Sequence, residues 1–235
     1  MGNVENEPAG TTATLAPATP EGGKHRRPRN PRGEGGRLAD EIVTAALDLI
    51  ERDGGEEAVT LRAVAREVGI AAPSIYAHFD GREAILLAVV QRVFGQLAEF
   101  SRAAIDAAPD PVAKLLAGTE AYVTFGLEHP ARYSVLFGSE RGRDMCKEGN
   151  LEIGRDGRPR LDYGGEAFDL LVAGIEACVD AGRSTSTDVV GDAVAVWVGL
   201  HGTVSLWSAL WAFPWPEREQ FVANLVLSLA KVTAP

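Results

Sequence analysis

Apolar residues recur at helical spacing along most of the chain from Leu38 onward. In the first such stretch, Ile42, Ala45 and Leu49 return every three or four positions, which predicts one buried face of a helix that ends at the glycines 54–55. No stretch alternates at period two for long enough to predict a sheet. The pattern therefore predicts an all-α fold. Prolines and glycines divide the later helices into about 60–69, 72–79, 82–105, 111–128, 131–137, 164–182, 188–211 and 217–232.

Two segments depart from this helical pattern. Residues 1–36 are rich in Gly, Pro, Thr and Ala and contain almost no large apolar side chain, so we expect them to be disordered in the free protein. Residues 138–163 combine six glycines and prolines with many charges. We expect this segment to be a long mobile loop, because loops of that length in a compact domain are either functional or disordered.

Two short helices around Gly69 predict a helix-turn-helix. Thr60 is a candidate N-cap for the first, and Gly69 suits the turn because glycine takes positive φ without a Cβ clash. Pro73 suits the first turn of the second helix. Asp80 and Glu83 have the spacing of a capping box that opens the next, long helix. In a helix-turn-helix, the second helix enters the major groove of DNA.

The segment TLRAVAREVGIAAPSIYAHFDGREAIL resembles the DNA-binding module of the TetR family, over about residues 38–85. Arg82 stands where the family usually has lysine, and Ile85 where it usually has leucine. The resemblance implies an N-terminal three-helix helix-turn-helix domain at 37–84. It further implies a helical effector-binding and dimerisation domain at 85–235. The function it implies is a repressor that binds a palindromic operator as a dimer and is released by a small molecule.

Within this module, hydroxyl and cationic side chains are candidate contacts with DNA phosphates, since such groups position a protein on the backbone. His78 taken alone is more often a solvated or packed histidine, and only the resemblance makes it a candidate contact. The candidate phosphate contacts are Thr60, Ser74, Tyr76, His78 and Arg82.

The candidates for reading bases are fewer. Arg62 is the best placed to reach a base edge, preferably a guanine. Ala72 and Pro73 expose only small apolar groups, which could meet a thymine methyl. Because such a recognition surface carries few donors, DNA shape should supply part of the specificity.

The distribution of charge along the chain, and not its sum, is consistent with DNA binding. The chain has a net charge of −10, but residues 24–37 hold six Lys and Arg against Glu34 alone, which is +5. A basic arm entering an adjacent minor groove and a passive solvated tail explain this cluster about equally well.

The C-terminal part contains WVGLHGTVSL, which resembles a TetR subgroup marked by a Trp-His-Gly signature. Trp197 and His201 lie one helical turn apart on one face. His201 is either a buried histidine bonded to a neighbour, the interpretation we favour, or a polar group at the edge of an effector pocket. The candidate effector-binding residues are Phe125, Tyr133, Phe137, Trp197 and His201. The expected effector is a small apolar or aromatic molecule.

The remaining features mostly exclude function classes. The four histidines and the cysteines Cys146 and Cys178 show no metal-ligand spacing, and no catalytic motif is present, so we expect no enzyme, metal or cofactor. No apolar run looks long enough for a bilayer and no signal peptide is visible, which favours the cytoplasm.

The apolar segments 188–211 and 217–232 predict a homodimer. An activator, or a helical dimeric ligand-binding or scaffolding protein without specific DNA readout, remains open.

Overall fold

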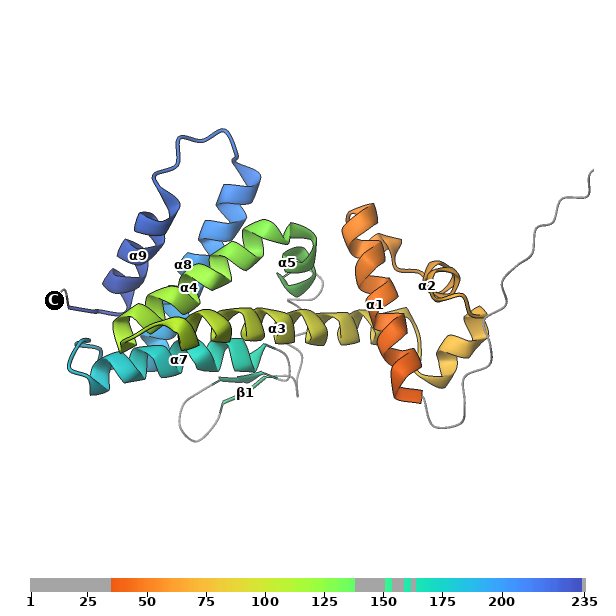
Figure 1. Cartoon of the computed structure of the whole chain (residues 1–235), viewed down its shortest axis with the longest axis horizontal. Helices are drawn as coiled ribbons and strands as arrows, with labels where there is room; N and C mark the ends of the chain where they lie inside the picture. Colours follow the sequence, from red (N-terminus) through yellow and green to blue (C-terminus); the bar gives the residue numbers. More distant parts are fainter. Residues whose placement is uncertain (1–34, 138–150, 154–158, 162–163, 234–235) are drawn as a thin grey trace, which may run out of the picture.

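The computed structural model describes residues 35–137, 151–153, 159–161 and 164–233. Two lobes of unequal size are joined by one long helix (Figure 1). The small lobe contains α1 (Gly35–Asp53), η1 (Glu56–Ala58), α2 (Leu61–Val68) and η2 (Ala72–Ala77), and the long helix is α3 (Arg82–Ala107). The large lobe adds α4 (Pro111–Glu128), α5 (Pro130–Phe137), α7 (Gly165–Asp180), α8 (Val189–Ala209) and α9 (Arg218–Leu229).

The helical architecture expected from the sequence is confirmed, with one small correction. Two three-residue strands, β1 (Leu151–Ile153) and β2 (Pro159–Leu161), pair antiparallel within the segment expected to be a loop. Strands this short are invisible to a search for alternation, which needs four or more residues. Of the expected disordered arm at 1–36, residues 35 and 36 belong to the first turn of α1, and residues 1–34 lie outside the described residues, as does the rest of the segment 138–163.

Local sequence signals set the helix-turn-helix, as expected. The Thr60 hydroxyl accepts a hydrogen bond from the Ala63 N–H at 3.1 Å, which caps α2 at its N-terminus. Gly69 ends α2 in the left-handed region with φ 76°. The second helix of the motif, however, is the 3-10 helix η2 rather than an α-helix, and its cap Ala71 has no side chain that could bond a backbone N–H.

The expected capping box at the start of α3 is wrong. The structure begins α3 at Arg82 with Gly81 as the cap residue, and no side chain caps it. Asp80 is therefore one residue too early, and Glu83 is the second residue of the helix instead of the third. Glu83 accepts a hydrogen bond from the Arg82 guanidinium at 2.7 Å.

Helix α3 contributes to the core of both lobes. With 26 residues it is about 39 Å long at 1.5 Å per residue. Ile85 and Val89 in its first half are fully buried, and α3 contacts α1 there (Figure 1). Leu97 and Ser101 in its second half are buried in the large lobe, where α3 contacts α4 and α7. One continuous helix therefore links the two lobes mechanically.

Two described helices, α3 and α8, are long and apolar enough to cross a bilayer by length and composition alone, which corrects the sequence-based expectation. Half of the most apolar window of α3 is buried in the protein, as in any core helix. Only 28% of the corresponding window of α8 is buried. Helix α8 thus carries apolar surface that its own chain leaves uncovered.

The turn glycine gives a stability prediction. Replacing Gly69 with Ala forces a Cβ into a left-handed backbone, so we expect the free energy of unfolding to fall by about 1–2 kcal/mol. Gly95→Ala is the matched control, because Gly95 lies inside α3 and an added Cβ meets nothing within 4 Å. There we expect stability to rise by up to about 1 kcal/mol, since Ala favours helices over Gly. Urea unfolding followed by circular dichroism measures both, and effects of the same sign would contradict this account.

Candidate functional site

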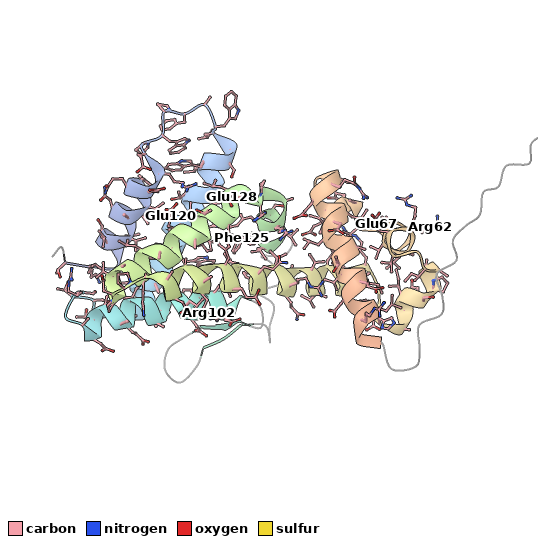
Figure 2. The ribbon with its side chains drawn as sticks, viewed as in Figure 1. Arg62, Glu67, Arg102, Glu120, Phe125 and Glu128 are labelled. Atoms are coloured by element: carbon pink, nitrogen blue, oxygen red, sulfur yellow. The ribbon has the colours of Figure 1, made fainter. Side chains whose placement is uncertain are left out.

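The helix-turn-helix presents a polar face to solvent and keeps its apolar anchor inside. Ile75 of η2 is fully buried, whereas its neighbours Ser74 and Tyr76 are exposed, Tyr76 to 59%. Pro73 is exposed and Ala72 half-buried on the same element. Figure 2 shows Arg62 on α2 in the small lobe, where it is exposed. These exposed side chains are available to a partner, but their contacts with DNA remain a prediction.

Three of the predicted phosphate contacts have further constraints. The Thr60 oxygen accepts the capping bond, so only its hydroxyl proton remains to be donated. His78 is half-buried at the end of η2. The Arg82 guanidinium donates to the backbone carbonyls of Val59 and Glu56, each at 2.8 Å. Arg82 therefore holds the η1 segment against the start of α3, a role that the sequence does not reveal.

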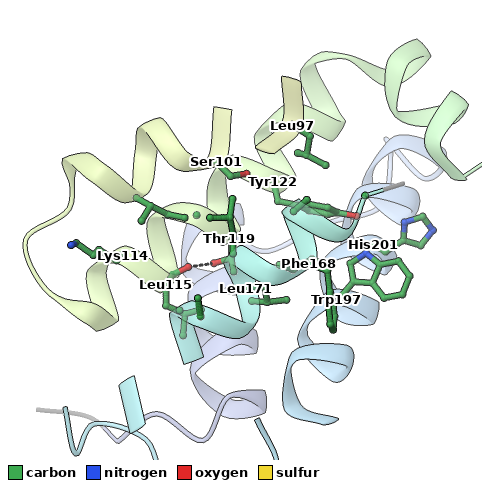
Figure 3. Close-up of a pocket in the computed structure, with 18 of the residues that line it drawn as sticks. Leu97, Ser101, Lys114, Leu115, Thr119, Tyr122, Phe168, Leu171, Trp197 and His201 are labelled. Atoms are coloured by element: carbon green, nitrogen blue, oxygen red, sulfur yellow. Dashed lines mark hydrogen bonds between the residues drawn. The ribbon is translucent and has the colours of Figure 1, made fainter. Parts of the chain in front are cut away.

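The large lobe encloses a cavity of about 730 Å³ between α3, α4, α5, α7 and α8. The described residues of its lining are mostly apolar and include no carboxylate; the side chains drawn in Figure 3 come from several helices. Volume and lining suit a small apolar molecule, since ligand pockets are mostly apolar with a few polar groups. Representative apolar members are Phe94, Leu97, Leu115, Leu136, Phe168 and Leu171.

The structure brings three of the five predicted effector-binding residues to this cavity. Phe137, Trp197 and His201 line it. Phe125 is buried and packs its ring against Phe100, and it does not line the cavity. Tyr122, three residues before Phe125 on α4, lines the cavity instead.

The fifth predicted residue, Tyr133, lies one layer behind the cavity wall. Its hydroxyl is 2.8 Å from the Tyr122 hydroxyl and 2.7 Å from Nδ1 of His201. Burial raises the pKa of Tyr122 to about 12 and lowers the pKa of His201 below its usual value of 6.5. All three groups are therefore neutral at pH 7. A chain in which Tyr122 donates to Tyr133 and Tyr133 donates to Nδ1 uses both hydroxyl protons and leaves the Nε2–H of His201 as a donor.

Helix α7 supplies a part of the wall that sequence reasoning missed. Ala167, Phe168, Leu171 and Gly174 face the cavity from this helix. Gly174 approaches α4 closely, because an added Cβ would be 3.2 Å from a Leu115 methyl carbon. Small and aliphatic residues of this kind are common in every helix core, so their sequence carries no signal for a ligand.

A tight contact between α4 and α8 lies next to the Tyr133 ring. A Cβ on Gly126 of α4 would come within 2.7 Å of a Val204 methyl carbon on α8 and 3.0 Å of the Tyr133 ring. Only glycine fits this crossing without displacing its neighbours.

Helix α5 touches both the cavity and the small lobe. On one side its Tyr133 reaches His201, and the Phe137 ring lies 4.7 Å from the His201 ring, centroid to centroid. On the other side Arg132 forms an ion pair with Glu51 of α1 and donates to Gln96 of α3 at 3.2 Å. Adjacent residues of one short helix thus contact the cavity wall and the DNA-binding lobe.

Helix α8 has two apolar faces with different environments. Val196, Leu200 and Val204 are buried within the lobe, whereas Val198 and Leu206 are 59% and 49% exposed. The connector to α9 adds exposed aromatic residues beside a stacked pair of Trp207 and Trp215, with ring centroids 3.9 Å apart. The further large apolar side chains left in solvent here are Leu210, Trp211 and Phe213, whereas Val194, although 40% exposed, lines the cavity.

Two family models match the chain. Residues 42–89 match the model described as bacterial regulatory proteins, tetR family. Residues 115–229 match a tetracyclin repressor-like C-terminal domain. The first match covers the helix-turn-helix, and the second covers most of the large lobe. The description of the C-terminal model does not specify the Trp-His-Gly subgroup, which stays a prediction.

Two curated relatives are HTH-type transcriptional regulators of mycobacteria. The uncharacterized regulator Rv0681 of Mycobacterium tuberculosis is 32% identical over 106 residues, 45% of this chain and 47% of that protein. The transcriptional activator FasR of Mycolicibacterium smegmatis is 30% identical over 130 residues, 55% of this chain and 57% of that protein. The chain therefore spans about half the length of the curated relatives it matches.

Among solved structures, the regulator FadR from Bacillus subtilis, in complex with stearoyl-CoA, has the same fold. It aligns with a TM-score of 0.57 and 16% identity, over 82% of this chain and 97% of that one. Both lobes are matched by family models, and the exposed helix-turn-helix joined to a helical lobe fits DNA-binding regulators rather than enzymes. The chain belongs to the TetR family of transcriptional regulators.

Proposed function

We propose that this regulator is a cytoplasmic homodimeric repressor that binds a palindromic operator and releases it when a small apolar effector occupies the cavity. The observation that carries the proposal is the 730 Å³ cavity, because α3 lines it and also starts at the helix-turn-helix. An effector that changes the packing around α3 acts directly on the element that orients the DNA-binding lobe.

The DNA-binding half of the proposal rests on the exposed face of the small lobe. Arg62 forms no ion pair with any described residue, so its guanidinium is available to a base. Tyr76 and Ser74 offer hydroxyls beside it, and the +5 segment at 24–37 supplies a cationic arm. Two copies related by a two-fold axis require a two-fold operator.

The homodimer follows from the outer face of α8. A helix with Val198 and Leu206 in solvent exposes contiguous apolar surface, which monomeric soluble proteins rarely do. A second copy provides a matching apolar face through the same helix. Pairing α8 and α9 of both copies buries this face without placing any of it in a membrane.

The effector half rests on the lining and on one structural neighbour. The FadR structure from Bacillus subtilis contains stearoyl-CoA, whose acyl chain is long and apolar. The cavity here is apolar along α3, α4 and α7, which suits an apolar chain or ring system. Activation is the second candidate, since the relative FasR is a transcriptional activator.

The structure offers two routes from the cavity to the small lobe. One is α3 itself, whose tilt sets the separation of the two recognition elements. The other is α5, through Tyr133 and His201 on the cavity side and the Arg132–Glu51 ion pair on the α1 side. Binding free energies couple reciprocally. Operator DNA must therefore lower the affinity of the protein for the effector by the same factor by which the effector lowers its affinity for the operator.

The first functional prediction separates base reading from backbone contact. We expect Tyr76→Phe to weaken binding to operator and to unrelated DNA by similar factors, since a phosphate contact carries no sequence information. We expect Arg62→Ala to cost about 1–3 kcal/mol on the operator alone and to reduce its preference over unrelated DNA. Fluorescence anisotropy at several salt concentrations measures both. Unchanged operator preference in Arg62→Ala would remove its base-reading role.

The second prediction concerns assembly. Val198→Glu places a carboxylate on the outer face of α8, so we expect dissociation to monomers at micromolar concentration, measured by sedimentation. Ala103→Glu adds the same charge at an exposed position of α3 and should leave the mass unchanged. Circular dichroism controls for folding. A dimeric Val198→Glu protein would place the interface elsewhere.

The third prediction tests the α5 route. Arg132→Met removes the contacts with Glu51 and Gln96, which lie outside the cavity lining. We expect stearoyl-CoA affinity to stay within about twofold while its effect on operator affinity falls severalfold. Arg102→Met is the control, because it breaks an exposed ion pair with Glu166 between α3 and α7. An unchanged coupling factor in Arg132→Met would assign the transmission to α3 alone.

A further inference from the structure

The polar groups of the cavity are distributed unequally between its two ends. Lys114 lies at one end of the side chains drawn in Figure 3, and Trp197 and His201 lie at the other. Lys114 and Tyr122 are both on α4, and their separation of eight residues corresponds to about 12 Å along the helix axis. The cavity is therefore elongated, with chemically different ends.

Among the described residues that line the cavity, Lys114 is the one that is charged at pH 7, and its side chain is exposed to solvent at the edge of the cavity. The described lining contains no Asp or Glu, and His201 is neutral because burial lowers its pKa. The nearest carboxylate along the chain is Asp110, which accepts hydrogen bonds from the Val112 and Ala113 N–H groups at 3.0 Å each and so caps α4. Lys114 forms no ion pair within the described part of the chain.

A second polar group between the ends has no partner. Ser101 of α3 lines the cavity and is only 7% exposed, and its hydroxyl makes no hydrogen bond with a described residue. The Thr119 hydroxyl, in contrast, donates to the Leu115 and Leu116 carbonyls at 2.9 and 3.0 Å. The Ser101 oxygen keeps some accessible surface, so it can be reached from the cavity, and an occupant can form a hydrogen bond with it.

We propose that the effector is an anionic amphiphile whose carboxylate binds Lys114 and whose apolar chain runs past Ser101 toward Trp197 and His201. This inference rests on the proposed function, in which the cavity is the effector site. The exposed ammonium of Lys114 at the edge of the cavity favours an anionic head group over a neutral or cationic one by a modest factor, since water also solvates both charges. The apolar walls of α3, α4 and α7 bury the chain, and each methylene removed from water adds to the affinity.

The test of the head group uses three probes with one alkyl chain: dodecanoate, dodecanol and dodecylamine. Calorimetry on the full chain should show dodecanoate binding about fivefold or more tightly than dodecanol, and dodecylamine binding weakest. Lys114→Gln should bring dodecanoate to the affinity of dodecanol, and Lys114→Arg should restore the preference. Arg66→Gln is the matched control, because it removes the same charge from an exposed position in the small lobe.

The test of orientation uses bromine as a quencher of tryptophan fluorescence. With the carboxylate at Lys114, 12-bromododecanoate places its bromine near Trp197 and should quench strongly, whereas 2-bromododecanoate should quench weakly. The remaining tryptophans, Trp207 near the end of α8 and Trp211 and Trp215 in the connector to α9, lie outside the lining, so Trp197→Phe should abolish the difference.

The outcomes distinguish this inference from the proposed function. Equal affinity for dodecanoate and dodecanol, insensitive to Lys114→Gln, would overturn the anionic head group while leaving an apolar effector site intact. Stronger quenching by 2-bromododecanoate would overturn the orientation. Failure of every probe to bind a protein that still binds operator would overturn both the inference and the effector half of the proposed function.

Discussion

The small lobe depends on α3 for its core. Ile42 and Leu49 of α1 bury their side chains only because Ile85, Leu86 and Val89 of α3 complete the same apolar cluster. Packed interiors resist deformation, so the helix-turn-helix cannot slide along α3 without losing that core. The first half of α3 and the small lobe therefore form one packed unit, so a change in the direction of α3 reorients the helix-turn-helix as a whole.

Local signals explain why the helix-turn-helix is readable from the sequence. The Thr60 cap, the left-handed Gly69 and the buried Ile75 each depend on a few neighbouring residues. Arg82 is a residue whose role local sequence does not predict. A cation near the recognition helix suggests a phosphate contact, but in the folded lobe its guanidinium donates to the backbone carbonyls of Glu56 and Val59. Its partners are more than twenty residues away and carry no side-chain signature.

The cavity was predictable in part, for a geometric reason. Trp197 and His201 lie one turn apart on one helix, so a single face accounts for both. On α4, however, Tyr122 and Phe125 are three residues apart and equally apolar in pattern. Which of the two side chains faces the cavity depends on the rotation of α4 about its own axis relative to α3 and α8. The spacing of apolar residues within α4 does not determine that rotation. The small residues of α7 give no signal at all.

The close crossing at Gly126 restricts how the large lobe can change shape. With Val204 and the Tyr133 ring against the α4 backbone, α4 and α8 cannot approach further, and the crossing acts as a fixed pivot. At the other end of α4, the contact between Gly174 of α7 and Leu115 is also close, since a Cβ on Gly174 would lie 3.2 Å from a Leu115 methyl carbon. The crossing of α4 and α8 near His201 is the tighter of the two contacts, so we expect a molecule too long for the cavity to separate α4 from α7 near Lys114 while the spacing of α4 and α8 is kept.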